Sequence, residues 1–328
     1  MVLREPGVTG HPPLREEELP TPVPGPGELA IAVEACAVCR TDLQLVQGDL
    51  TARRLPIVPG HQIVGRVSAV GAGVDGWREG DRAGAYWLAG ACGRCRHCRA
   101  GRENLCEQSE FTGWDRDGGF ATDTVVRAAF AVPLPHDRPA AALAPLLCGG
   151  VIGHRALRVS GAGPGDTLGL FGFGASARST LQVARHLGCR VMVCTRGDVD
   201  RARARALGAE WAGDFDELPP VPLDAAITFA PVGEVVVNAL RALDRGGTVA
   251  INAIHLDRVP EFPYSLLWWE RSVRSVANVT RADAEEFLAL AAAIPVVTDH
   301  TDYPLTDANR ALADLADGTL SGSAVLVV

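Results

Sequence analysis

Four cysteines close together in the chain are the residues whose types and spacing most clearly predict chemistry. Cys92, Cys95, Cys98 and Cys106 form the pattern Cys-x2-Cys-x2-Cys-x7-Cys, and four thiolates in one loop can surround a tetrahedral zinc ion completely. Two disulfides or four unrelated thiols are the alternatives, but two successive two-residue gaps suit chelation better than disulfide geometry. Because a closed site leaves no position for a reactant, we expect this zinc to be structural.

Two further cysteines and one histidine offer the ligands of a second, reactive zinc site. Such a site needs three protein ligands and one open position. Cys39 lies in CAVCRTD, His61 in PGHQIVG and Cys148 in PLLCGG. These segments are far apart in the sequence, so only the fold can bring them together. On spacing alone, two buried cysteines and one hydrogen-bonded histidine are an equally good interpretation.

A glycine-rich turn predicts a binding site for a dinucleotide. The apolar segment TLGLF leads into Gly172, Gly174, Ala175, Ser176 and Ala177, which follow the pattern G-x-G-x-x-A, and then into a predicted helix. Gly172 would make the tight turn, Gly174 would let the backbone approach a pyrophosphate, and Ala177 would allow the helix to pack closely on the strand. Free N–H groups at the helix N-terminus would face the phosphates. The alternative is a glycine turn without a ligand.

The residues about 20 positions later indicate which dinucleotide is bound. An acidic side chain there would bind the adenosine ribose and favour NAD, whereas this chain has Thr195 and Arg196. Thr195 could hydrogen-bond a 2′-phosphate and Arg196 could clamp it, so NADP is favoured and NAD is the alternative. Asp198 lies close enough to serve NAD. Arg201 is the residue of the next, arginine-rich segment best suited to assist, although a solvent-exposed helix face explains that segment more simply.

The composition excludes several other classes of protein. The chain has 328 residues, is 47% hydrophobic, carries a formal net charge of −8 and contains no lysine. It therefore lacks the basic surface of a nucleic-acid-binding protein, and no mechanism can use a lysine. Nine cysteines without a signal-peptide pattern indicate reduced thiols and a cytoplasmic location. The most apolar stretch, 140–153, contains a proline and is too short to span a membrane.

Two kinds of local pattern must position these residues. Short strands expected at 29–38, 62–70 and 121–132, with glycine and proline between them, predict a compact β-rich domain. From residue 166 strands alternate with helices, which predicts a parallel sheet covered on both faces. After residue 282 two helices and a last strand should return to the first domain. We therefore expect an α/β protein, in which 273–277 forms either an internal strand or one paired across a subunit boundary.

Taken in order, six segments resemble the zinc-dependent alcohol dehydrogenases of the medium-chain dehydrogenase/reductase superfamily, namely CAVCRTD, PGHQIVG, GDRAG, the four-cysteine segment, PLLCGG and GFGASA. The resemblance covers essentially the whole chain. It implies a GroES-like β-rich catalytic domain at 1–150, with a structural zinc lobe at about 90–107, completed by 281–328. It also implies a Rossmann domain of doubly wound parallel sheet at 151–280, and a homodimer or homotetramer.

The resemblance implies roles for single residues as well. Cys39, His61 and Cys148 would hold the catalytic zinc. Asp42 matches the carboxylate that orients the ligating histidine, and Thr41 matches the hydroxyl that bonds the substrate oxygen and starts the proton path.

Three other positions match residues that touch the cofactor or the substrate. Arg40 matches a basic residue that approaches the cofactor pyrophosphate. Trp87 and Leu88 match positions that line the substrate pocket, with ordinary core packing as the alternative for both.

Three positions depart from the family pattern without removing a zinc ligand. Gln44 replaces a histidine that relays the alcohol proton, and glutamine cannot titrate near neutral pH. Gln62 follows His61 where glutamate is common, which leaves the site more positive by one charge. Ile152 stands where threonine is common beside the nicotinamide.

These observations predict an oxidoreductase that transfers hydride reversibly between NAD(P)H and an alcohol, aldehyde or ketone, with two zinc ions per chain. Interruption of the proton relay makes zinc- and NADPH-dependent reduction of an activated C=C or iminium bond an alternative. A cofactor-binding protein without turnover is a second alternative. We expect a small-molecule substrate and neither nucleic acid nor membrane as a partner.

Overall fold

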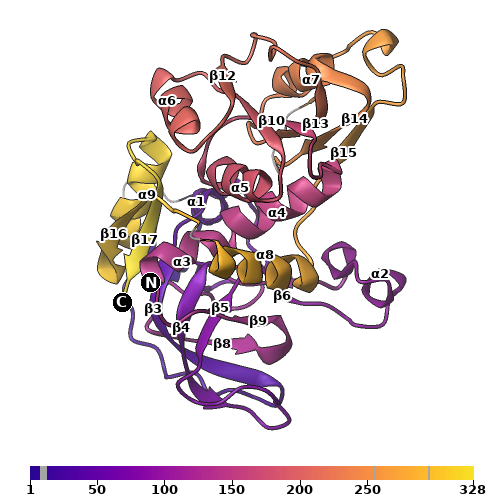
Figure 1. The fold of residues 1–328 in the computed structure, drawn as a ribbon. Helices are drawn as coiled ribbons and strands as arrows, with labels where there is room; N and C mark the ends of the chain where they lie inside the picture. The colour runs from indigo at the N-terminus through magenta and orange to yellow at the C-terminus, as the bar shows by residue number, and fades with distance from the viewer. Residues whose placement is uncertain (8–12, 254–255, 257, 295) are drawn as a thin grey trace. The chain divides into compact units, whose positions relative to one another are not determined.

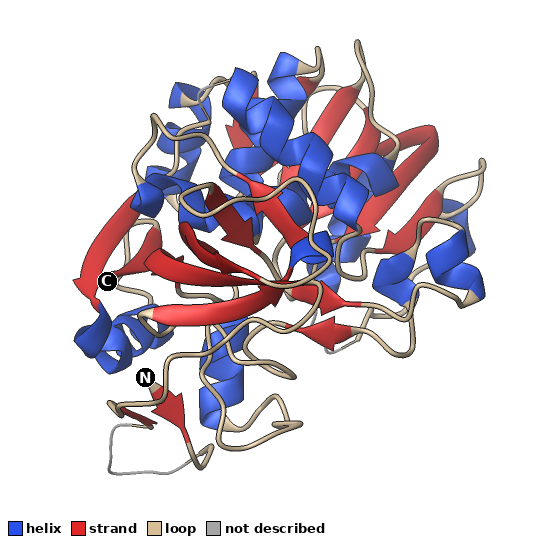
Figure 2. Cartoon of the chain, turned by 90° about the horizontal axis from the view of Figure 1, so that it is seen from below, coloured by secondary structure: helices blue, strands red, loops and turns tan. Residues whose placement is uncertain are grey.

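The computed structural model describes residues 1–328 except 8–12, 254–255, 257 and 295 (Figures 1 and 2). It contains two compact units. Unit 1 comprises Met1–Cys148, Thr280–Leu288 and Val297–Val328, and unit 2 comprises Gly149–Val279 and Ala289–Val296. Both units combine helices with strands, and the sheet of unit 2 is parallel throughout, so the predicted α/β class is confirmed.

Unit 1 is built on a seven-stranded sheet with the order β16-β17-β3-β4-β5-β9, in which β8 also pairs with β3. All these pairings are antiparallel except that of β16 with β17. The last strand, β17, pairs with β3, so the C-terminal segment completes a sheet begun near the N-terminus. The strands are β3 (Glu28–Ala37), β4 (Ile63–Val70), β5 (Arg82–Ala85), β8 (Asp123–Arg127), β9 (Ala131–Pro133), β16 (His300–Pro304) and β17 (Ser323–Val327).

The core of unit 1 explains why these segments form a sheet. Leu29, Ile31 and Val33 alternate along β3 and are buried in one cluster with Ile63 of β4 and Leu326 of β17. Burial of apolar side chains at alternate positions holds the strand register, because a slip of one residue would turn every apolar side chain outward.

Unit 1 also contains shorter elements, together with the first part of α8, whose last residues belong to unit 2. Two small antiparallel pairs are formed by β1 (Val2–Leu3) with β2 (Leu14–Arg15) and by β6 (Leu88–Gly90) with β7 (Glu110–Phe111). The helices and 3-10 turns are α1 (Arg40–Gln47), α2 (Arg96–Arg99), η1 (Glu103–Leu105), η2 (Ala128–Phe130), α3 (Ala140–Leu143), η3 (Ala144–Leu147), α8 (Arg281–Ala293), η5 (Leu305–Asp307) and α9 (Ala308–Asp317).

Unit 2 contains a six-stranded parallel sheet with the order β12-β11-β10-β13-β14-β15. In chain order this is 3-2-1-4-5-6, the arrangement of the Rossmann dinucleotide-binding fold. The elements are α4 (Gly149–Ser160), β10 (Thr167–Phe171), α5 (Ala175–His186), β11 (Arg190–Cys194), α6 (Asp198–Ala206), β12 (Trp211–Gly213), β13 (Leu223–Thr228), α7 (Gly233–Ala242), β14 (Leu243–Ile251), η4 (Tyr264–Leu266) and β15 (Ser272–Ser275).

The strand order places the glycine-rich turn at a functional position. The strand β10 is fully buried along its length and lies between β11 and β13. In a doubly wound sheet the order of connection reverses between the first and fourth strands, and ligands bind beyond the carboxyl ends of the strands at this point. The turn after β10 therefore occupies the position where this fold binds dinucleotides.

The apolar run at Ala140–Ser160 is longer than the stretch recognised in the sequence. It covers 21 residues, and its most apolar window has a mean hydropathy of 1.4, which by length and composition alone would allow it to cross a membrane. However, 61% of its most apolar window is buried inside the protein, and the run is divided among α3, η3 and α4. This is the pattern of a core helix.

Candidate active site and metal centres

The first turn of α1 positions Cys39 and the residues beside it. Cys39 is the N-cap of the helix, and its backbone N–H donates to Oδ2 of Asp42 at 2.8 Å, which completes a capping box. At the other end Gly48 adopts φ 88°, the left-handed conformation that stops a helix. Leu43, Leu45 and Val46 are buried and anchor the helix to unit 1.

Asp42 also fixes His61. Its Oδ1 lies 3.2 Å from Nδ1 of His61 and accepts a hydrogen bond from the N–H of Gly60 at 3.2 Å. Both side chains are buried. Because a carboxylate accepts, Nδ1 carries a proton toward Asp42, and Nε2 is the atom that would bind a metal ion, the arrangement found behind many metal-bound histidines. Gly60 has φ +97°, and a Cβ there would strike the ring of Phe120 at 2.4 Å, so this position requires glycine.

The three predicted ligands converge in unit 1. The ligand atoms of Cys39, His61 and Cys148 all lie within 4.8 Å of one another, and the two sulfurs are 3.9 Å apart. Zinc–sulfur bonds of about 2.3 Å in a tetrahedron require a sulfur–sulfur distance of about 3.8 Å. Two sulfurs and one imidazole nitrogen are also a suitable donor set for catalytic zinc. The residues present therefore fit this ion.

The ionisable groups of the three-ligand cluster strongly perturb one another's pKa values. A hydrogen bond from Cys148, assisted by His61, holds the pKa of the Cys39 thiol well below its ordinary value. The same bond raises the pKa of Cys148 well above it. Burial alone would lower the pKa of His61, but Asp42 and Cys39 raise it to about 10. These residues thus hold protons that a metal ion would displace, because ligation requires deprotonated groups.

The four-cysteine segment brings four sulfur atoms together in unit 1, in an arrangement that could hold a second metal ion. The sulfurs of Cys92, Cys95, Cys98 and Cys106 lie within 4.8 Å of one another. The N–H groups of Cys95 and Cys98 donate to the sulfurs of Cys92 and Cys95 at 3.3 and 3.4 Å. Backbone N–H groups, with that of Arg94 first, lower the pKa of Cys92 to about 6. Four thiols of which one ionises readily fit a closed zinc site, and all nine cysteines of the chain are free of disulfides.

Aromatic rings adjoin the three-ligand cluster. Trp87 meets His61 edge-on with ring centroids 4.9 Å apart, and it stacks on Phe111 at 5.0 Å and on Trp114 at 5.8 Å. Leu88, by contrast, is completely buried and pairs with Phe111 across β6 and β7. Sequence reasoning named Trp87 but missed Phe111 as its neighbour. The segment FTGW, which follows the cysteine lobe with two aromatic residues three positions apart, was the signal available for finding it.

The remaining residues near the cluster differ in their surroundings. The hydroxyl oxygen of Thr41 lies 3.9 Å from the sulfur of Cys39, and Arg40 is exposed at the start of α1. Gln62 is buried and its amide donates to the carbonyl of Ala37 at 3.2 Å. Gln62 thus serves to join two segments of the sheet, which explains a neutral amide at this position. Gln44 is half-buried on α1.

The glycine-rich turn of unit 2 has the geometry of a phosphate-binding turn. Gly172 has φ +100° and its N–H donates to the carbonyl of Cys194 at 2.8 Å. Gly174 is the N-cap of α5, and no atom lies within 4 Å of the position that its Cβ would occupy. Ala177 is fully buried, whereas Ala175 is exposed and Ser176 half-buried. Open space at Gly174 beside the N–H groups of a helix start is what a pyrophosphate requires.

The two arginines considered for a phosphate contact after β11 differ in whether their guanidinium groups already have partners. Arg201 bonds the carboxylates of Asp198 at 2.7 Å and Asp214 at 3.0 Å, and it donates to the carbonyl oxygens of Thr195 and Arg196. Its guanidinium is therefore occupied in holding the loop, which argues against the direct phosphate contact considered from the sequence. The side chain of Arg196 is exposed, and its guanidinium has no partner among the described residues.

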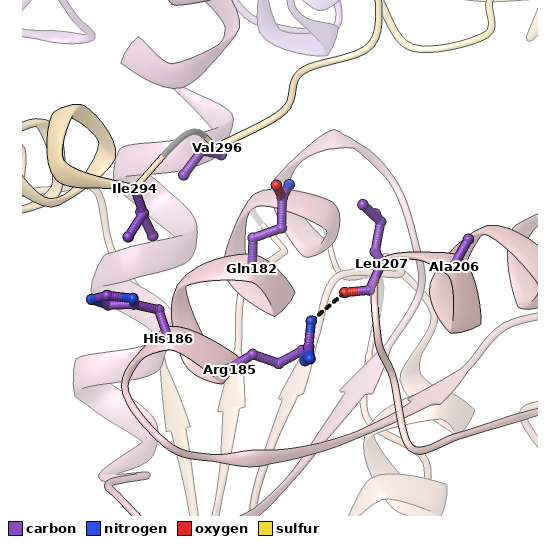
Figure 3. Close-up of a pocket in the computed structure, with 7 residues that line it drawn as sticks. All are labelled: Gln182, Arg185, His186, Ala206, Leu207, Ile294 and Val296. Carbon is purple, nitrogen blue, oxygen red and sulfur yellow. Dashed lines mark hydrogen bonds between the residues drawn. The ribbon is translucent and has the colours of Figure 1, made fainter.

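Unit 2 also has a pocket of about 410 Å³, shown in Figure 3. Its lining includes Arg185, which donates to the carbonyl of Leu207 at 2.9 Å. None of the candidate site residues lines it. The complete lining is Gln182, Arg185, His186, Ala206, Leu207, Ile294 and Val296.

Comparison with known proteins agrees with this geometry. The family of the alcohol dehydrogenase GroES-like domain matches residues 25–136. The chain is 50% identical to the probable alcohol dehydrogenase AdhA of Mycobacterium tuberculosis over 332 residues, which cover 99% of this chain and 96% of that protein.

Two solved structures extend the similarity to the whole fold. The cobalt- and zinc-bound thermostable alcohol dehydrogenase of Pyrobaculum aerophilum has a TM-score of 0.89 at 26% identity, over 100% of this chain and 99% of that one. The acetophenone reductase of Geotrichum candidum in complex with NAD has a TM-score of 0.87 at 25% identity, over 100% and 97%. The chain therefore belongs to the zinc-dependent alcohol dehydrogenase family of the medium-chain dehydrogenase/reductase superfamily, which are NAD(P)-dependent oxidoreductases of alcohols and carbonyl compounds.

Proposed function

We propose that this chain interconverts a small alcohol and its aldehyde or ketone, with a catalytic zinc ion on Cys39, His61 and Cys148 and a structural zinc ion on the four-cysteine lobe. The observation that carries the proposal is the convergence of the three ligand atoms within 4.8 Å, with Asp42 fixed behind His61. When bound, zinc would supply a Lewis acid that polarises the substrate oxygen, and the nicotinamide would give or take the hydride.

The protein residues would orient the reactants and move the proton. Asp42 holds the His61 ring through Nδ1, so that Nε2 keeps one direction. The Thr41 hydroxyl, near the sulfur of Cys39, would donate a proton to the substrate oxygen in reduction and accept it in oxidation. Trp87 would cover one side of the site and exclude water, which strengthens the electrostatic interactions there.

The half-buried Gln44 favours a second candidate reaction. Glutamine cannot accept and release a proton near neutral pH, so the path from Thr41 to solvent must run through water. Reduction of an activated C=C or iminium bond does not need this relay, because no alkoxide forms on the product.

For the cofactor we propose NADP, with NAD as the alternative. Gly172, Gly174 and the start of α5 would hold the pyrophosphate. The exposed, unpaired Arg196 would bind the 2′-phosphate, and Thr195 would flank it. The arginine fork matches phosphate oxygens in geometry and charge.

We also propose a cytoplasmic homo-oligomer, either dimer or tetramer. β15 is the last strand of its sheet, with three of its four residues exposed, and Trp268 and Trp269 nearby in the chain are each about half exposed. An open strand edge beside exposed aromatic rings favours pairing with a second copy. The nine free cysteines favour a reducing compartment.

A nucleotide-dependent activity screen tests the proposal. Zinc-loaded protein would be assayed with NADH and with NADPH on paired ketone and enone substrates, after its metal content had been measured. We expect two zinc ions per chain and carbonyl reduction with NADPH preferred. Cys148→Ser should retain one zinc ion and lose turnover. Preferential reduction of the enone C=C bond would favour the second candidate, and protein with both zinc ions but no NAD(P)H oxidation would refute both.

A further inference from the structure

Three stacked rings form an aromatic shelf in unit 1 that begins at a zinc-ligand candidate. The shelf consists of Trp87, Phe111 and Trp114, whose ring planes lie within 30° of parallel and whose centroids are 5.0–5.8 Å apart. Trp87 also meets the ring of His61 edge-on. Trp87 and Trp114 are only half-buried, so both residues keep accessible surface close to the three-ligand cluster.

An arginine lies over the Trp114 ring of the shelf. The guanidinium carbon of Arg53 lies 3.8 Å from the ring centroid of Trp114 and 5.4 Å from that of Phe111. The Trp114 Nε1–H donates to the carbonyl of Thr51 at 2.9 Å, so the segment that carries Arg53 is tied to the same ring twice. An arginine over an indole face gains both cation–π attraction and stacking of its flat fork.

A carboxylate keeps this arginine in place. Nη1 of Arg53 donates to both oxygens of Asp115, at 3.2 and 3.0 Å. Asp115 is itself fixed to the shelf, because its Oδ2 accepts from the N–H of Phe111 at 2.9 Å and its own N–H donates to the Phe111 carbonyl at 2.9 Å. Asp115 therefore holds the Arg53 guanidinium over the Trp114 ring.

We propose that Arg53, held by Asp115, is a specificity-determining positioning residue. By stacking on Trp114, it fixes the Trp114 ring against Trp87. The Trp87 ring is thereby held in the orientation that a substrate next to His61 would contact. A rigid flat surface favours substrates whose carbonyl carries a planar, unsaturated or aromatic group, because such groups stack on an indole face over their whole area. This inference rests on the proposed carbonyl reduction, since it concerns the choice of substrate at the same site.

The next residue in the chain provides a matched control. Arg54 pairs with Asp117 at 2.6 Å, and its side chain is 48% exposed against 45% for Arg53. Unlike Arg53, it lies over no aromatic ring among the described residues. Arg53→Lys keeps the charge and loses the flat fork, and Arg54→Lys makes the same change without touching the shelf.

The experiment compares benzaldehyde with cyclohexanecarbaldehyde, two aldehydes of one carbon skeleton that differ in flatness. The measured quantity is the ratio of their kcat/KM values for the zinc-loaded enzyme. Arg53→Lys and Asp115→Asn should lower this ratio roughly two- to fivefold, the range expected when one cation–π contact and the stacking of its flat fork are weakened. The loss should appear in the KM for benzaldehyde with kcat nearly unchanged, because stacking on a remote group is uniform binding. Near-UV circular dichroism should weaken in both variants, since Trp87 and Trp114 lose their fixed stacking.

Arg54→Lys should leave both the ratio and the spectrum unchanged. An unchanged ratio in both Arg53→Lys and Asp115→Asn would overturn the inference while leaving carbonyl reduction intact. An equal decrease in Arg54→Lys would overturn it too, because the effect would then belong to surface charge. Wild-type protein that holds both zinc ions and reduces neither aldehyde with either nucleotide would instead count against the proposed function.

Discussion

Replacing Asp42 by asparagine tests the role of a single buried carboxylate behind the three-ligand cluster. Asp42 accepts three hydrogen bonds, from Cys39 N–H at Oδ2 and from Gly60 N–H and the His61 ring at Oδ1. An asparagine has one oxygen and one NH2 group. In one orientation the NH2 group faces the Cys39 N–H, and in the other it faces the Gly60 N–H and the His61 ring. An NH2 group cannot accept a hydrogen bond from these donors, so either the α1 cap or the His61 contact is lost.

The size of the effect follows from these contacts. A buried donor that loses its acceptor costs about 1–3 kcal/mol. Loss of the partner behind a ligating histidine lowers metal affinity by about 10–100-fold, which corresponds to about 1.4–2.8 kcal/mol. We therefore expect Asp42→Asn to weaken zinc binding at Cys39, His61 and Cys148 by one to two orders of magnitude, and turnover to fall with occupancy.

Competition with a chromogenic chelator, combined with metal analysis, would measure this loss. The four-cysteine zinc ion serves as an internal reference, because its ligands do not touch Asp42. Asp49→Asn is the matched control, since Asp49 is exposed just beyond α1 and has no partner among the described residues. Unchanged zinc affinity at Cys39, His61 and Cys148 in Asp42→Asn would refute the reasoning. Equal loss of zinc from this site and from the four-cysteine lobe would refute it too.

Three further predictions concern the cofactor and the structural lobe. Gly174→Asp should lower NAD(P)H affinity at least about tenfold without loss of thermal stability, because aspartate is a good N-cap but repels a pyrophosphate. Dye-displacement titration would measure the affinity, and a melting curve would measure the stability. Retained affinity would contradict the assignment of this turn as the phosphate site. Arg196→Glu should raise the Kd for NADPH by more than about tenfold and leave that for NADH nearly unchanged, as fluorescence titration would detect; equal effects would count against a 2′-phosphate contact. Cys106→Ser should release the zinc ion of the four-cysteine lobe and lower Tm, because a loop without a core of its own depends on its metal for folding. A variant that still holds two zinc ions and has an unaltered Tm would contradict this prediction.

The turn after β10 and the cysteine lobe were accessible from the sequence because their geometry is local. Gly172 needs a positive φ and Ala177 needs a small side chain, and both requirements are visible as residue types. The cysteines of the lobe lie within 15 positions, so a short loop is enough to gather them. Alternation of strands and helices likewise predicted the parallel sheet of unit 2.

Contacts between distant segments were not accessible in this way. Arg201 was considered for a phosphate contact, but Asp214, 13 residues away, occupies its guanidinium. Arg53 and Asp115 are separated by 62 positions, and nothing in either segment indicates that they flank one ring. For Leu88 the sequence left both pocket lining and core packing open, and only the fold shows that it is buried against the neighbouring strand.

The sequence by itself determined which chemistry is possible, because residue types decide which atoms can bind zinc, phosphate or a proton. Only the tertiary structure decided which of those atoms meet. Cys39 and Cys148 are 109 positions apart, and their sulfurs come together because Cys39 begins α1 and Cys148 ends η3. The physical reason is that ligation and stacking act over only a few ångströms. Whether residues far apart in the sequence come that close depends on how the whole unit packs.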